Sequence, residues 1–94
     1  MTQTPLSIII PHWQNASDLE RLLASIPTKK GYEIIVVDDY SDDNCFKKVV
    51  ELHESYNFTL LKNNGKKSAG TCRNIGLSHA TGKWILFADA DDFF

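Results

Sequence analysis

The sequence predicts a doubly wound α/β fold: a parallel sheet of strand order 3-2-1-4 with helices on both faces. Three observations lead to this prediction. Apolar runs rich in β-branched residues alternate with segments whose apolar residues recur at helical spacing. A helical crossover separates each run from the next, so neighbouring strands must pair in parallel. Acidic or turn-forming residues follow the strands, as expected where loops leave the carboxyl edge of such a sheet.

The first strand is predicted at residues 6–10, a run rich in isoleucine that Pro11 ends. The loop after it leads into a helix whose N-cap is Asn15 or Ser17. Leucine and isoleucine recur at helical spacing along this segment until Pro27 ends the helix. We expect this helix to cover one face of the sheet.

Three more strands and two more helices follow. Residues 34–37, 58–61 and 83–88 are predicted strands, because each is a short apolar run between polar segments. One helix is predicted to begin at Asp42, and another to occupy residues 69–80. Right-handed crossovers between these strands give a Rossmann-like parallel sheet, and the order 3-2-1-4 places its switch point between the first and fourth strands.

The composition describes one globular unit of residues 1–94. The chain is 43% hydrophobic and 23% charged, with ten Lys and Arg against twelve Asp and Glu. A net charge of -2 lacks the basic field that nucleic acid requires, so no nucleic-acid partner is expected. Cys45 and Cys72 have no metal-ligand spacing and are typical of reduced thiols in the cytoplasm. Residues 6–10 are too few for a signal peptide or a membrane span.

Acidic residues gather at the predicted carboxyl edge of the sheet. Residues 38–43 follow the second strand, and residues 89–92 place three carboxylates after the fourth. Trp13 lies in the loop after the first strand, so all three segments project toward one crevice. Carboxylates this close repel one another unless a cation lies among them, and a divalent cation with phosphate ligands meets that need. The sequence therefore predicts a metal-assisted site for a nucleotide bearing a diphosphate.

Each of these features also has a purely structural interpretation. Asp38 and Asp39 are equally consistent with an Asx turn that caps the next helix. Residues 89–92 alone are consistent with a solvated turn, and Arg73 is as consistent with a surface ion pair as with a phosphate contact. Trp13 alone is consistent with core packing. Only their combination at one edge favours a binding site.

Four motifs in this order resemble those of family 2 glycosyltransferases, which are inverting enzymes with the GT-A fold. The resemblance covers nearly the whole chain, and four ordered motifs are far more specific than any one of them. The motifs are residues 7–11 (SIIIP), 36–43 (VVDDYSDD), 64–65 with 73–76 (NG and RNIG), and 82–92 (GKWILFADADD). The chain ends on Phe93 and Phe94 without a polar tail. We therefore expect a truncated GT-A domain: its N-terminal, nucleotide-sugar-binding half without the acceptor half.

The resemblance assigns roles to individual residues. Trp13 stands where the family has an aromatic residue that stacks on the base, and Asp39 where a carboxylate accepts a hydrogen bond from a base N–H, as a uracil edge offers. Asp89 and Asp91 match the outer positions of the Asp-x-Asp motif, the first near the ribose and the last coordinating Mn²⁺ or Mg²⁺. The expected donor-binding residues are Pro11, Trp13, Asp39, Arg73 and Asp89, and the expected metal ligands are Asp91 and Asp89.

The resemblance further implies transfer of a sugar from a nucleotide-diphosphate sugar, with a UDP-sugar as donor, to a saccharide or lipid-linked acceptor of the cell envelope. Inversion needs a general base that takes the proton of the acceptor hydroxyl. In the family this carboxylate belongs to the acceptor half, so it is expected downstream of Phe94. This chain alone is accordingly expected to bind the donor without transferring its sugar, in the cytoplasm or peripherally at the membrane as part of a longer protein.

Departures from the family pattern and rival functions stay open. Trp13 replaces the usual tyrosine, and Tyr40 stands where glycine is common, which requires either an ordinary backbone angle or a shifted turn. The main alternative is a non-catalytic nucleotide-binding or interaction module. A receiver domain is disfavoured because its phosphorylated aspartate ends the third strand, where this chain has Lys62 and Asn63. The open edge of the fourth strand also predicts a homodimer.

Overall fold

A four-stranded parallel sheet in the order β3-β2-β1-β4 forms the centre of the molecule, which confirms the predicted topology. The computed structural model describes residues 5–27 and 30–89. The strands are β1 (Leu6–His12), β2 (Glu33–Asp38), β3 (Thr59–Lys62) and β4 (Trp84–Phe87). The helices are α1 (Ala16–Ser25), α2 (Asp43–Ser55) and α3 (Ala69–His79). Helices and strands alternate along the chain, as predicted.

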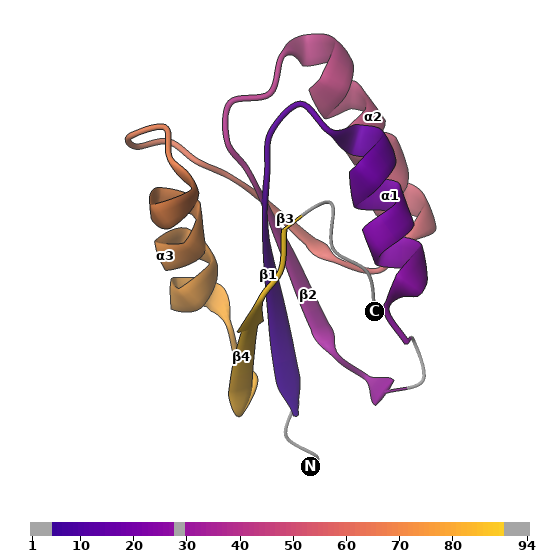
Figure 1. The fold of residues 1–94 in the computed structure, drawn as a ribbon, viewed down its shortest axis with the longest axis vertical. Coiled ribbons are helices and arrows are strands. Elements are labelled where there is room, and N and C mark those ends of the chain that lie inside the picture. Colours follow the sequence, from indigo (N-terminus) through magenta and orange to yellow (C-terminus); the bar gives the residue numbers. More distant parts are fainter. Residues whose placement is uncertain (1–4, 28–29, 90–94) are drawn as a thin grey trace.

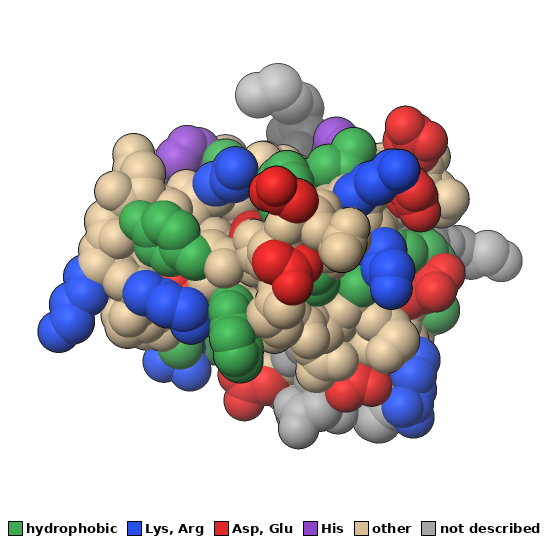
Figure 2. Space-filling view, turned by 90° about the horizontal axis from the view of Figure 1, so that it is seen from above, with side chains coloured by type: hydrophobic (Ala, Val, Ile, Leu, Met, Phe, Trp, Pro, Cys, Tyr) green, Lys and Arg blue, Asp and Glu red, His purple; other side chains and the backbone are tan. Residues whose placement is uncertain are grey.

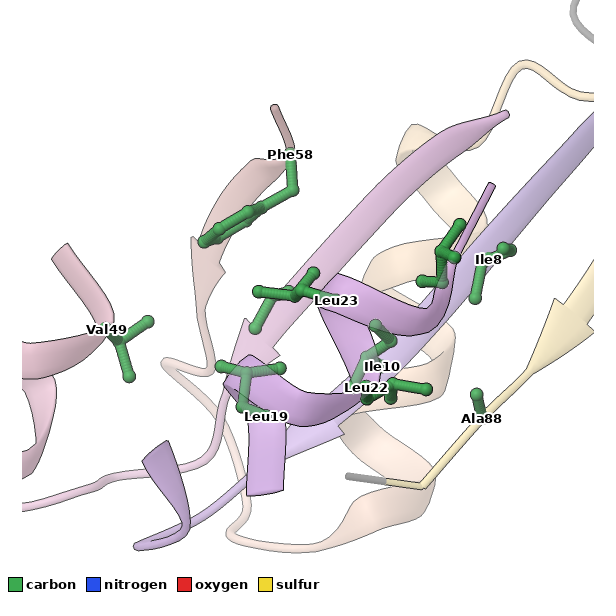
Figure 3. Packing of buried hydrophobic residues seen from close by; sticks show 10 residues of the cluster. Ile8, Ile10, Leu19, Leu22, Leu23, Val49, Phe58 and Ala88 are labelled. Atoms are coloured by element: carbon green, nitrogen blue, oxygen red, sulfur yellow. The ribbon is translucent and has the colours of Figure 1, made fainter. Parts of the chain in front are cut away.

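The helices cover both faces of the sheet, with α1 and α2 on one side and α3 on the other (Figure 1). Alternate residues of a strand point to opposite faces, so each buried strand supplies both layers. The larger core includes Ile8, Ile10 and Leu22, and Figure 3 shows its strand residues facing the leucines of α1. The smaller core packs Val37 against Cys72 of α3. The prediction of helices on both faces is therefore confirmed.

β1 continues through Pro11, and the prediction that this proline ends the strand was wrong. Ile9 O accepts a hydrogen bond from Ala88 N, so Ile9 and, two residues later, Pro11 turn their backbone groups toward β4. The pairing of β4 with β1 ends at the pair Ile9 and Phe87. Pro11 lies beyond that point, so no ladder hydrogen bond is lost through its missing N–H. β1 meanwhile stays paired with β2 as far as His12.

The predicted residues Asn15 and Asp42 both occupy N-cap positions, and side-chain hydrogen bonds cap two of the three helices. Asp42 accepts a hydrogen bond from Cys45 N at 2.8 Å and caps α2, and Ser68 caps α3 through Thr71 N at 3.0 Å. Asn15 occupies the N-cap position of α1 without a side-chain cap bond. Its amide instead donates to Asp18 in the first turn, at 3.0 Å. These bonds fix the first turn of each helix at the carboxyl edge of the sheet.

β4 is an edge strand with an exposed surface. Its Trp84 side chain is 66% exposed, and Ile85 and Phe87 are exposed as well. An open apolar edge favours pairing with another chain, so the homodimer stays a prediction. Within the described part of the chain, no helix is both long enough and apolar enough to span a bilayer.

Candidate functional site

The loops after β1, β2 and β3 meet at the carboxyl edge of the sheet. Asp39 N donates to His12 O and Asn63 N donates to Asp38 O, each at 2.8 Å, so sheet-like pairing extends past the strand ends. These bonds align the residues that follow each strand. Figure 2, which views this edge from above, shows exposed hydrophobic side chains between basic and acidic ones. The edge therefore offers an exposed hydrophobic surface and charges of both signs.

A buried His12–Asp38 pair supports this edge. Both side chains are almost fully buried, and His12 Nδ1 lies 2.9 Å from Asp38 Oδ1. Asn15 N donates to His12 Nε2 at 3.0 Å, so the ring proton belongs to Nδ1, which donates to Asp38. The second Asp38 oxygen accepts a bond from Ser41 N. Asp38 thus joins two loops, and it is Asp42, not Asp38, that caps α2.

The electrostatics of Asp38 agree with this role. Burial alone would raise the pKa of its carboxyl, but the hydrogen bonds from His12 and Ser41 outweigh burial and hold the pKa below its usual value. The sequence prediction did not identify His12 as a site residue. One signal for it was present, since His12 follows Ile8 and Ile10 in the period-two series that faces the larger core.

Asp39 is a carboxylate at the rim, only 6% exposed. Its Oδ1 accepts a hydrogen bond from Asn63 Nδ2 at 2.9 Å, and its Oδ2 lies 3.9 Å from Lys67 Nζ. The pKa of the Cys72 thiol is raised to about 11, mainly because the thiol is buried and secondly because Asp39 carries a negative charge. Asp39 therefore keeps one oxygen tied to the protein and turns the other toward Lys67.

Trp13 lies on the other side of Lys67. The Lys67 ammonium is 4.3 Å from the centroid of the Trp13 ring, in cation–π geometry. Trp13 is 54% exposed, so core packing does not explain it. Trp13 and Asp39 are brought together as the sequence predicted, and the space between them contains the Lys67 ammonium. We call this space the base slot, after the role that the resemblance predicts for its two walls.

The loop that carries Lys67 is held by two side chains. The Asn63 amide donates to Lys66 O and accepts from Gly65 N, at 2.9 and 2.8 Å. The Tyr40 hydroxyl donates to Gly65 O at 2.6 Å. Asn63 is buried and also binds Asp39, a role that the sequence prediction missed. Lys67 is therefore presented to the base slot by an ordered loop.

Two residues of this edge have left-handed backbone angles. Tyr40 has φ +65° and Gln14 has φ +50°. Tyr40 thus adopts a backbone angle that glycine reaches more readily, so the predicted ordinary backbone angle was wrong. Gln14 bonds Asp42 twice, donating from Nε2 and accepting from the Asp42 N–H at 2.9 and 2.6 Å. Such strain persists only where surrounding contacts over-determine it, which is typical of binding loops.

The remaining predicted residues lie around this edge. Pro11 is partly buried near the end of β1, and Asp89 is exposed just after β4. The guanidinium carbon of Arg73 lies 6.0 Å from the Phe87 ring, so Arg73 faces β4. Asp91 and Asp92 lie outside the described residues. Within residues 5–27 and 30–89, no three His, Cys, Asp or Glu side chains are grouped as metal ligands.

Comparison with known proteins places the chain among sugar-transferring enzymes. The family model described as Glycosyl transferase family 2 matches residues 7–94. An uncharacterized glycosyltransferase of Haemophilus influenzae is 37% identical over 93 residues, which cover 95% of this chain and 30% of that protein. The Escherichia coli UDP-Glc:alpha-D-GlcNAc-diphosphoundecaprenol beta-1,3-glucosyltransferase WfgD is 35% identical over 91 residues, which cover 95% of this chain and 36% of that protein. The chain thus spans about a third of the length of these relatives.

Solved structures agree with the sequence comparisons. The crystal structure of S. aureus TarS 1-349 in complex with UDP has a TM-score of 0.79 and 29% identity, covering 96% of this chain and 28% of that one. The mannosyltransferase PcManGT from Pyrobaculum calidifontis, in complex with GDP-Man and Mn2+, has a TM-score of 0.79 and 27% identity, covering 100% of this chain and 29% of that one. The sheet order, the site at its carboxyl edge and these matches lead to one conclusion: the chain belongs to glycosyl transferase family 2 and has the GT-A fold of that family.

Proposed function

We propose that this chain binds the nucleotide-sugar donor of an inverting glycosyltransferase and that the donor is a UDP-sugar. The observation that carries the proposal is the base slot, where the exposed Trp13 ring and the Asp39 carboxylate both lie next to one ammonium group. A base stacks on an aromatic ring, and a carboxylate accepts a hydrogen bond from an N–H of its edge. Support comes from the similar TarS, which is solved with UDP and with UDP-GlcNAc.

The base slot is suited to one edge of a pyrimidine. Asn63 already donates to Asp39 Oδ1, so Oδ2 is the oxygen left for a donor entering from the slot. Uracil presents an N–H between two carbonyl groups, and an ionised carboxylate only accepts hydrogen bonds. Pro11, on the strand that leads to Trp13, is proposed to line the slot with a residue that has no N–H.

The diphosphate of the donor is proposed to bind beside the slot, with Mn²⁺ or Mg²⁺ held by Asp89 and Asp91. Asp89 is an exposed carboxylate at a strand end, and hard cations take carboxylate oxygens as ligands, so this residue fits the role. A bound cation would supply charge to offset that of the departing diphosphate. Arg73 is proposed to supply further positive charge near β4. The Pyrobaculum mannosyltransferase, solved with GDP-Man and Mn2+, supports a metal in this fold.

The acceptor is proposed to be a saccharide or a lipid-linked saccharide of the cell envelope. The names of two relatives support this class: one acts on a diphosphoundecaprenol-linked GlcNAc and another is a poly(ribitol-phosphate) beta-N-acetylglucosaminyltransferase. The general base that takes the acceptor proton is proposed to lie downstream of Phe94. The reaction is accordingly proposed to take place in the cytoplasm, peripherally at the membrane.

Calorimetric titration with UDP, with and without Mn²⁺, tests the donor site. We expect UDP to bind more tightly with Mn²⁺, and Asp91→Ala to remove only the metal-dependent gain. Asp39→Asn should weaken UDP binding in both conditions, because the amide repels the base N–H through its own donor. Glu54→Gln, on the exposed end of α2, is the matched control and should bind as the wild type does. Failure of the wild type to bind UDP in either condition would refute the proposal.

A further inference from the structure

We propose that Lys67 is an internal stand-in for the nucleobase: its ammonium fills the base slot in the free protein and must leave before a base can enter. This inference rests on the proposed function, because it concerns the same slot. It adds a residue that competes with the donor and thereby sets its affinity. The evidence is the position of Lys67 between Trp13 and Asp39.

The ammonium makes the two contacts that a bound base would make. It lies on the Trp13 ring at 4.3 Å from the centroid, and 3.9 Å from Asp39 Oδ2. A stacked aromatic ring needs its centroid about 4.5 to 7 Å from that of Trp13. On the side of Trp13 that faces Asp39, the Lys67 ammonium occupies the space that such a stacked ring would need. A base that both stacks on Trp13 and donates to Asp39 therefore excludes Lys67 from its present position.

The Lys67 side chain starts from an ordered loop, so it can compete with a base, and it is exposed enough to move out of the base slot. Its loop is ordered through Asn63 and Tyr40, so the side chain starts from a defined point beside the slot. The side chain itself is 50% exposed, so it can rotate into solvent without leaving a cavity. The cation–π contact and the ion pair of this half-exposed lysine are each modest on their own, but both are lost when a base enters.

Lys67→Met tests the competition, because methionine removes the ammonium and keeps an unbranched side chain. Uridine is the probe, since it carries no phosphate that a lysine would attract. We expect Lys67→Met to bind uridine about three- to tenfold more tightly than the wild type. Lys66→Met is the matched control: Lys66 is the exposed neighbour on the same loop, and its variant should stay within about twofold of the wild type.

A second measurement tests the contact itself without any ligand. In a Trp84→Phe background Trp13 is the one remaining tryptophan of the sequence, so protein emission reports on its ring. Lys67→Met should change that emission in the free protein, and Lys66→Met should not. Unchanged emission would overturn the stand-in, because the ammonium would then not lie on the ring.

The outcomes separate this inference from the proposed function. Uridine that binds Lys67→Met no more tightly than the wild type overturns the stand-in and leaves the donor site standing. If neither uridine nor UDP binds the wild type or any variant, both proposals fail. Tighter uridine binding together with a changed Trp13 emission supports the stand-in.

Discussion

His12 Nδ1 lies 2.9 Å from Asp38 Oδ1, and this buried bond joins the ends of β1 and β2. The next residue after each partner is a wall of the base slot: Trp13 follows His12, and Asp39 follows Asp38. Backbone pairing between Asp39 N and His12 O adds a second connection at the same level. The distance between the two walls is therefore set by a rigid pair beneath them, as binding sites require.

Removing His12 is expected to destabilise the protein. His12→Ala leaves the buried Asp38 carboxylate without its main donor, and we expect the free energy of unfolding to fall by about 3 kcal/mol. Urea denaturation measures this loss. His79→Ala, at the exposed end of α3, is the control and should change stability by less than about 0.5 kcal/mol. Equal losses in the two variants would show that the buried His12–Asp38 pair does not contribute to the free energy of unfolding.

The free energy of unfolding is expected to fall in acid because the Asp38 carboxylate becomes protonated. Its pKa in the folded protein lies below the ordinary value of 3.8, so the unfolded chain binds the proton first as the pH falls. The ionised Asp38 makes its full contribution to the free energy of unfolding above pH 3.8. This contribution is lost as the pH drops through the lower pKa of the folded state. Urea midpoints measured from about pH 5 to about pH 2.5 should show this loss, and Asp38→Asn should flatten it. The same slope in the variant would contradict the assignment.

The hydroxyl of Tyr40 is expected to order the loop that carries Lys67. Tyr40→Phe removes only the bond to Gly65 O, so the ring and its left-handed backbone angle remain. Hydrogen exchange followed by mass spectrometry should show faster exchange in residues 63–67, because this loop opens more easily. Tyr32→Phe, beside the larger core, is the control and should leave that exchange unchanged. Unaltered protection in Tyr40→Phe would show that Asn63 alone holds the loop.

Gly82 is expected to tolerate no side chain. A Cβ there would lie 2.5 Å from both Ser7 N and Ser7 Oγ, so Gly82→Ala must push the connection off β1 and break the bond from Gly82 N to Ser7 Oγ. We expect a loss of about 2 to 3 kcal/mol in chemical denaturation. Gly70→Ala is the matched control, since the nearest atom to its Cβ is Ser68 Oγ at 3.9 Å. That substitution should be neutral or stabilising, because alanine favours a helix over glycine by about 1 kcal/mol.

The open edge of β4 is expected to drive self-association. Light scattering after size exclusion should show a dimer at high concentration, paired through β4. Ile85→Lys places a charge on this edge and should restore the monomer, whereas Leu77→Lys, which changes an exposed residue of α3, should not. A wild type that stays monomeric at every concentration would disprove the predicted homodimer.

The sequence predicted the elements well because their signals are local. The β-branched runs of β1 and β2 and the helical spacing of Leu19, Leu22 and Leu23 can be recognised within about ten residues of chain. Parallel crossovers then leave few topologies, so the order β3-β2-β1-β4 followed. Pro11 was misjudged because its effect depends on where a neighbouring strand ends, and no local pattern contains that information.

For the candidate site, too, the sequence predicted some features and only the tertiary structure decided others. From the sequence alone one can tell that Trp13 and Asp39 follow adjacent strands and meet at one edge, since parallel strands end on the same side. Tertiary structure alone decided that His12 is bonded to Asp38 beneath them and that Lys67 lies between them. Such contacts depend on side-chain directions and on the path of a loop that returns from β3, and these are set by packing across the whole fold.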